Sequence, residues 1–348
     1  MEERNMHFEK IHLDDIVRCY CAGHITVDGR FYALFASENP ESEAYAYYGD
    51  RFENRETLWL DRGGCMSIIP FETRKGEFLA VNEFYLKVSP SKAKIVHGRK
   101  TRDGWEIKDL FPLPFVHRFD IYHVNGKDYI ICATIALDKD NKEDWSRPGQ
   151  IYVAQLPEDL SEPFELTKLA DRCYRNHGYW RGSHNGKVCG YFGSDQGVLR
   201  VTPPYSETET WKVEKILDGM ISEIATIDID GDGLEEMKTI EPFHGNKIRI
   251  YHLDENGEYR QVWEYGNEID FAHTLVGRRL AGKPAFVAGV RRMDCELFVT
   301  TYEDGEYKVT VVDNGGPANV DVVNCDGYDL ILAANHTRNE AAVYIVTE

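Results

Sequence analysis

Residues 24–36 read HITVDGRFYALFA: an apolar run, a tight turn at Gly29 and a second apolar run. This pattern is typical of a β-hairpin, because apolar runs rich in β-branched and aromatic residues form strands and glycine accepts the positive φ of a tight turn. Six further stretches have the same form, and their turn glycines recur about every 45 to 60 residues, the length of a four-stranded propeller blade. These glycines are Gly76, Gly126, Gly186, Gly233, Gly282 and Gly327.

Two more strand-like runs follow each hairpin, such as KIRIYHL (247–253) and YRQVWEY (259–265), so each repeat predicts four antiparallel strands. The last repeat lacks one strand, and FEKIHLDDI (8–16) would supply it. We therefore predict an all-β, seven-bladed β-propeller, a single domain over residues 1–348, in which the N-terminal strand completes the last blade. The alternative, a pair of β-sandwiches or an open array, would leave that strand without a partner.

The chain carries 59 acidic and 40 basic residues, and its formal charge of −19 repels nucleic acid and anionic lipid surfaces. We therefore expect no nucleic acid and no membrane partner, and a neutral or cationic ligand fits better. The first 15 residues contain no apolar segment, which predicts a cytoplasmic protein. The eight cysteines have no CxxC spacing, and this favours buried thiols over disulfides or a thiolate metal site.

Three histidines occupy one repeat position, since His117, His177 and His273 each lie nine residues before their turn glycine. Rotational symmetry would place them at one level where the innermost strands begin, at the top of the central channel. A lone histidine is commonly a core or surface residue, but converging neutral imidazoles are ligands for Zn²⁺, Mn²⁺ or Fe²⁺. The pattern predicts a divalent transition-metal centre at the channel mouth.

Further polar residues are expected on the same face, at the ends of the second strands and in the loop at residues 136–149, which we interpret as a lid. Aromatic rings would stack on a sugar while carboxylates and arginine bind its hydroxyl groups. The catalytic candidates are His336 and His244 as acid or base, Arg291 as a ligand of substrate oxygens, and Tyr20. The candidate substrate-binding residues are Trp180, Tyr179, Glu83, Glu241, Asp195, Trp145 and Arg147.

An acidic turn in the fifth repeat contains Asp228, Asp230, Asp232, Gly233 and Glu236. Several carboxylates in one tight loop suit the oxygen coordination of calcium. The spacing resembles the calcium loop of FG-GAP (VCBS, integrin-like) propeller repeats, and this resemblance implies a structural Ca²⁺ held by the four acids. The alternative is a solvated acidic turn.

Histidines at the channel mouth and one FG-GAP-like blade make the chain similar to propeller carbohydrate lyases and dehydratases of the aldos-2-ulose dehydratase type. The resemblance implies a metal-dependent carbohydrate lyase, dehydratase or isomerase that abstracts a proton and eliminates a leaving group from a small sugar. An alternative is a non-catalytic propeller that binds a glycan or a protein on its top face. Glycosidase chemistry through Glu83 and Glu241 also remains open.

Overall fold

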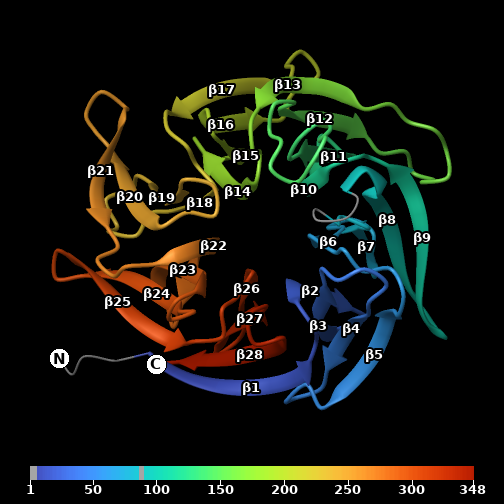
Figure 1. Cartoon of the computed structure of the whole chain (residues 1–348), viewed down its shortest axis with the longest axis horizontal. Coiled ribbons are helices and arrows are strands. Elements are labelled where there is room, and N and C mark those ends of the chain that lie inside the picture. The colour runs from blue at the N-terminus through green and yellow to red at the C-terminus, as the bar shows by residue number, and fades with distance from the viewer. Residues whose placement is uncertain (1–5, 86–89) are drawn as a thin grey trace.

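The structure of the protein is a computed structural model that describes residues 6–85 and 90–348. Seven four-stranded antiparallel sheets form a ring around a central channel (Figure 1). The prediction of an all-β, seven-bladed propeller is confirmed. No helix among these residues is long and apolar enough to cross a membrane.

Each blade presents one strand to the channel and three strands outward. The innermost strands are β2 (Cys19–Val27), β6 (Ile68–Pro70), β10 (Val116–Val124), β14 (Gly178–His184), β18 (Glu223–Ile227), β22 (Asp270–Leu280) and β26 (Asn319–Asn324). The second strands are β3 (Arg30–Ser37), β7 (Glu77–Asn82), β11 (Lys127–Thr134), β15 (Lys187–Ser194), β19 (Glu236–Glu241), β23 (Lys283–Arg292) and β27 (Asp329–Asn335). The third strands are β4 (Ala44–Tyr48), β8 (Lys94–Thr101), β12 (Gly149–Gln155), β16 (Gly197–Thr202), β20 (Lys247–Leu253), β24 (Leu297–Glu303) and β28 (Glu340–Thr347). The outermost strands are β5 (Asn54–Trp59), β9 (Gly104–Pro112), β13 (Thr167–Cys173), β17 (Lys212–Leu217), β21 (Tyr259–Glu264), β25 (Glu306–Asp313) and β1 (His7–Asp15), and one 3₁₀ turn, η1 (Pro90–Lys92), precedes β8.

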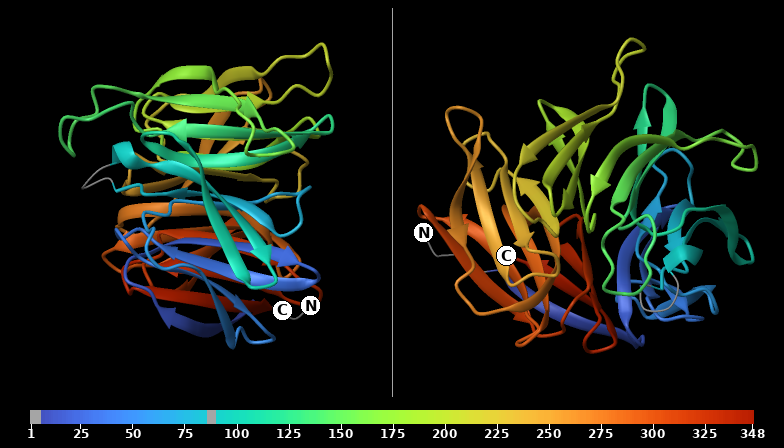
Figure 2. Two further views of the ribbon diagram at one scale, coloured as in Figure 1. Left: turned by 90° about the vertical axis from the view of Figure 1, so that its right-hand side faces the viewer. Right: turned by 45° about the horizontal axis from the view of Figure 1, so that its top comes forward.

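The N-terminal strand closes the ring, as predicted. β1 pairs antiparallel with β28 from His7↔Thr347 to Asp15↔Glu340, so the first strand of the chain lies beside the last one (Figures 1 and 2). Ile11 and Leu13 of this strand pack on the apolar cluster of the first and last blades. Closure therefore both pairs the edge of β28 and adds apolar contacts.

The core lies between adjacent blades. Second strands such as β27 are buried along their whole length, because both of their faces pack on a neighbouring blade. Outermost strands such as β17 are mostly exposed. All eight cysteines are free thiols, and six of them are buried.

Candidate functional site

One residue from each blade meets at the level where the innermost strands begin. We call this set the channel ring, and it consists of Tyr20, Met66, His117, His177, Ser222, His273 and Ala318. Tyr20, His117 and His273 each sit at a β-bulge, where the register between the first and second strands shifts. A bulge redirects a side chain out of the regular alternation, which here turns all three toward the channel.

The backbone confirms that these positions are equivalent. In six of the seven blades the residue two positions before the channel ring has a left-handed φ of 48° to 68°. Such a φ is uncommon for residues other than glycine, so its recurrence marks one repeated local structure. The residues are Arg18, Gly64, Phe115, Arg175, Phe271 and Gly316.

Three histidines bring ring nitrogens within 4.8 Å of one another: His177, His244 and His273. The Nε2 atoms of His177 and His244 are 3.2 Å apart. Two nitrogen ligands of a tetrahedral Zn²⁺ would be about 3.3 Å apart, given metal–nitrogen bonds of about 2.0–2.1 Å. His177 and His244 therefore have the spacing of two ligands of one metal ion, and a ring nitrogen of His273 lies within 4.8 Å of both.

The outer nitrogens of two of these rings are held by the backbone of the next blade. His177 Nδ1 lies 3.1 Å from the Ser222 carbonyl oxygen, and His273 Nδ1 lies 2.6 Å from that of Ala318. Since a carbonyl oxygen only accepts, each Nδ1 carries a proton, and Nε2 is the nitrogen left to bind a metal ion. Metal-binding histidines are commonly oriented in this way.

Burial keeps the imidazoles of His244 and His273 in their neutral, metal-binding form. Loss of solvent lowers the pKa of His244 and of His273 well below the usual histidine range, and nearby positive groups such as Arg291 lower it further. Neutral imidazole is the form that binds a metal ion. These residues thus fit a divalent transition metal.

His244 reaches the cluster from the loop between β19 and β20. Its backbone has a φ of 48°, and its N–H donates to the Ser222 hydroxyl at 3.0 Å. Gly245 follows, at a point where a Cβ would lie 2.1 Å from the Glu241 carbonyl oxygen. The tight loop therefore needs glycine there and holds the His244 ring between Phe243 and Phe271, with centroid separations of 3.9 and 4.3 Å.

Tyr20 and His117 lie beside the three-nitrogen cluster. The Tyr20 hydroxyl is 3.4 Å from His273 Nε2 and 3.5 Å from His117 Nε2. Burial raises the pKa of Tyr20, so that its hydroxyl keeps its proton at neutral pH. Burial lowers the pKa of His117 well below its usual value, so that this imidazole is neutral. The pair thus offers one proton donor and one proton acceptor.

A buried ion pair forms the floor under the histidines. Arg118 Nη2 is 3.0 Å from Glu223 Oε1, and the same oxygen lies 2.9 Å from His177 Nδ1. Arg118 also donates to the Met66 and His177 carbonyl oxygens, at 3.2 and 3.3 Å. Together these contacts connect four blades and orient the His177 ring.

A cavity of about 240 Å³ opens above the cluster, and a charged group forms part of its wall. His336 Nε2 lies 2.7 Å from Glu38, and Arg18 donates to the same carboxylate. Arg291 contacts His336 through Nη2, at 2.8 Å from Nδ1, while its Nε is buried without a hydrogen-bond partner. Within residues 6–85 and 90–348, Arg291 makes no ion pair with a carboxylate, so its charge is available to a ligand.

The loop at 136–149 reaches the histidine cluster through Trp145. This ring lies 5.3 Å from Phe243, which lies 5.4 Å from His177. Arg175 stacks over Trp145, 5.6 Å from the ring centroid, and forms an ion pair with Asp195 at 3.5 Å. Asp195 is therefore linked to Trp145 only through Arg175. The loop is therefore anchored beside the cavity.

Several predicted substrate-binding residues lie elsewhere. Glu83 pairs with Lys94, Glu241 pairs with Arg249, and neither side chain lines the cavity. Both carboxylates are paired with cations on the third strands of their blades, away from the channel. This argues against Glu83 and Glu241 as the two catalytic carboxylates of a glycosidase. Arg147 pairs within its own loop with Asp138, Asp140 and Asp144, so it stabilises the loop and does not reach the cavity.

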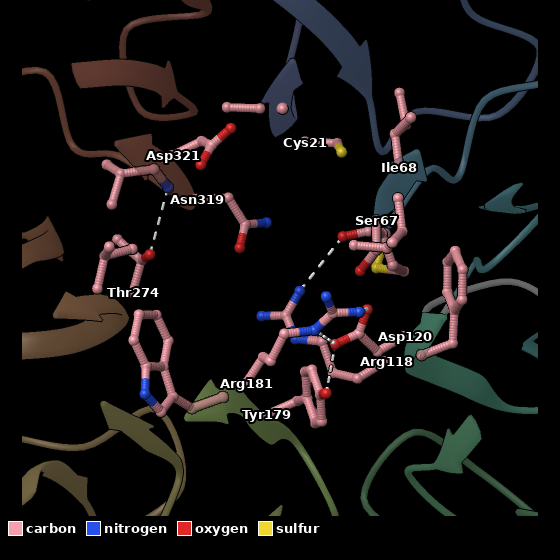
Figure 3. A pocket seen from close by; sticks show the side chains of 18 of the residues that line it. Cys21, Ser67, Ile68, Arg118, Asp120, Tyr179, Arg181, Thr274, Asn319 and Asp321 are labelled. Carbon is pink, nitrogen blue, oxygen red and sulfur yellow. Dashed lines mark hydrogen bonds and ion pairs between the residues drawn. The ribbon is translucent and has the colours of Figure 1, made fainter. Parts of the chain in front are cut away.

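Tyr179 and Trp180 line a second cavity of about 380 Å³ deeper in the channel (Figure 3). Figure 3 shows Arg118, Asp120, Tyr179 and Arg181 on one side of this space and Thr274, Asn319 and Asp321 on the other. Both aromatic residues follow His177 along the innermost strand, and each step along a strand moves the side chain farther down the axis. Both residues therefore lie deeper in the channel than the histidines, and their role in substrate binding stays a prediction.

The acidic turn brings together only part of the predicted calcium set. Asp230, Asp232 and Glu236 lie with His252 of β20, and one ligand atom of each lies within 4.8 Å of the others. Asp228 instead accepts hydrogen bonds from the N–H groups of Gly231 and Gly233, which occupy both of its oxygens.

Sequence reasoning missed Arg118, Glu223 and His252. Arg118 and Glu223 each directly follow a channel-ring residue, which is a weak signal that the repeat alignment contains. His252 lies on the third strand of its blade, and no spacing connects it to the acidic turn.

Comparison with known proteins identifies the fold. The Cps50 (Swd1) β-propeller domain of Myceliophteria thermophila is 11% identical with a TM-score of 0.58, covering 97% of this chain and 99% of that one. The extracellular domain of a "putative one component system" from B. thetaiotaomicron is 12% identical with a TM-score of 0.59, covering 97% of this chain and 39% of that one. A "putative 6-phosphogluconolactonase" from Bacteroides uniformis is 14% identical with a TM-score of 0.51, covering 90% and 88%.

These similarities define the class, a seven-bladed β-propeller, and nothing narrower. No protein-family model matches the chain, and no curated protein matches it by sequence. The resemblance to FG-GAP propellers and to aldos-2-ulose dehydratases stays a prediction.

Proposed function

We propose that the protein is a metal-dependent carbon–oxygen lyase, dehydratase or isomerase that acts on a small sugar bearing a carboxylate. The observation that carries this proposal is the convergence of His177, His244 and His273 beside the proton donor Tyr20 and the proton acceptor His117. A bound divalent cation would supply Lewis-acid polarisation of a substrate oxygen.

Arg291 supports an acidic substrate. A half-buried guanidinium without a carboxylate partner is a site for a planar, bidentate anion. The overall negative charge of the chain favours neutral ligands, but the cavity is also lined by Arg18 and Arg292, so its local charge differs from that average. The substrate carboxylate is expected to lie against Arg291.

The proposed reaction moves one proton from carbon and one to oxygen. Neutral His117 accepts the proton from the carbon next to the carboxylate, and the electrons of the broken C–H bond form a carbon–carbon double bond. The C–O bond at the next carbon breaks, and the leaving oxygen takes its electron pair and a proton from Tyr20. Phe243 and Trp145 limit access of water on one side.

Metal analysis provides the first test. Wild-type protein and His177→Ala are purified without chelator, and their bound metals are measured by mass spectrometry. His123→Ala is the control, because His123 lies on the same strand as His117 but is exposed and pairs with Asp128. We expect His177→Ala to lose one transition-metal ion per chain and His123→Ala to keep it.

Activity is then tested on a panel of sugar acids and acidic oligosaccharides. The expected product contains a conjugated double bond, seen by ultraviolet absorbance and confirmed by mass. Sugar binding without turnover, in a channel free of metal, would contradict the enzyme and support the non-catalytic propeller.

A further inference from the structure

The acidic turn at residues 228–235 joins β18 to β19, at the end of β18 opposite to the channel ring. Its carboxylates face the imidazole of His252 on the adjacent strand β20. His252 Nε2 lies 2.9 Å from Asp232 Oδ2 and 3.3 Å from Glu236 Oε1. The turn therefore meets a nitrogen donor that lies outside its own sequence motif.

Backbone hydrogen bonds occupy one oxygen of each carboxylate in the cluster. Asp230 Oδ1 accepts from the Asp232 N–H, Asp232 Oδ1 from the Leu234 N–H, and Glu236 Oε2 from the Ile229 N–H. The second oxygen of each acid remains for the interior of the cluster. Three carboxylate oxygens and one imidazole nitrogen thus face one another.

Glu236 supplies an observation independent of the acidic composition. Its side chain is fully buried, and Oε1 accepts no hydrogen bond, although the His252 imidazole lies 3.3 Å away. A buried carboxylate oxygen that accepts no hydrogen bond is costly, and native structures commonly provide such an atom with a cation or a donor. This oxygen points toward the other three ligand atoms.

We propose that Asp230, Asp232, Glu236 and His252 form a site for a transition-metal ion of the Mn²⁺ or Zn²⁺ class, in place of the calcium that the turn sequence predicts. Calcium takes oxygen ligands, whereas imidazole favours the later divalent metals. The bound ion connects the β18–β19 turn to β20 and stabilises the fifth blade. The site stands independently of the function proposed for the channel.

The test uses the full-length protein after removal of metals by chelation. MnCl₂, ZnCl₂ and CaCl₂ are titrated separately by calorimetry, and the thermal midpoint is measured with each. We expect Mn²⁺ or Zn²⁺ to bind more tightly than Ca²⁺, with His252→Gln binding one ion fewer than wild type. The difference between the two proteins does not depend on whether the channel histidines bind metal.

Asp254→Asn is the control, because Asp254 is a neighbouring acid that pairs with Arg260 outside the cluster. It should bind as many ions as wild type. Should His252→Gln fail to fold, nitrogen-15 NMR of the wild-type histidines replaces it, and the His252 Nε2 resonance must shift on addition of Zn²⁺. Tighter binding of Ca²⁺, an unchanged stoichiometry in His252→Gln, or an unshifted His252 resonance would overturn the proposal.

Discussion

Replacing Glu223 by glutamine should destabilise the protein and weaken the histidine site together. The side chains of Arg118 and Glu223 are only 9% and 4% exposed, and the bond between them is 3.0 Å long. Burial works against the charge of Arg118, but the attraction of Glu223 outweighs it and raises the pKa of the guanidinium. In Glu223→Gln, Arg118 would therefore remain charged and buried without its carboxylate.

The expected cost is about 3 kcal/mol, at the lower end of the range for breaking a buried ion pair, because the glutamine oxygen still accepts a hydrogen bond. The free energy of unfolding is measured by urea denaturation. Glu214→Gln is the control, since Glu214 pairs with Arg200 at 3.2 Å but is half exposed, and its loss should cost less than about 1 kcal/mol.

The same substitution removes the carboxylate beside His177 Nδ1, so the affinity for the channel metal should fall about tenfold or more. The double variant Arg118→Met/Glu223→Leu should regain most of the stability, because no charge is left unpaired. The reasoning fails if Glu223→Gln unfolds within about 1 kcal/mol of wild type.

Three further outcomes are expected. Burial disfavours ionised Glu38, but hydrogen bonds from His336 and Arg18 outweigh it and lower its pKa to about 2. The resulting stabilisation is complete above the ordinary value of 4.5 and is lost as pH falls toward 2. The free energy of unfolding of Glu38→Gln should therefore depend less on pH between about 4.5 and 2 than that of wild type. An unchanged pH dependence in this range would exclude a stabilising role of ionised Glu38. Deletion of residues 2–15 should lower the thermal midpoint and cause association, seen by light scattering, because β28 loses its partner, whereas a shorter deletion that spares β1 should not. Tyr20→Phe should lower kcat about 100-fold or more while metal content stays at the wild-type level, and equal loss of both would assign Tyr20 a structural role.

The repeat was readable from the sequence because its signals are local. A turn glycine sets the phase of the strands on either side, and seven such turns at similar spacing determine seven equivalent blades. The same phase identified His117, His177 and His273 as neighbours, and the recurring left-handed φ two residues earlier shows why the alignment works. The closure of the ring was predicted by counting strands. The last repeat contains only three strands, and the N-terminal segment supplies the fourth.

Which residues form the histidine cluster and the acidic-turn cluster depends on contacts between strands. These contacts cannot be predicted from a local sequence pattern. His244 became the third nitrogen because the turn before Gly245 directs it inward, while His117 paired with Tyr20. Glu83 and Glu241 turned outward to cations on neighbouring strands.

His252 of β20 lies beside the acidic turn, and the proposal of a transition metal there depends on this contact. The sequence by itself determines which segments become blades and which residues share a level, because both depend on spacing along the chain. Only the tertiary structure decides which atoms face one another across blades, because side-chain direction depends on bulges, loop conformation and the charges of neighbouring strands.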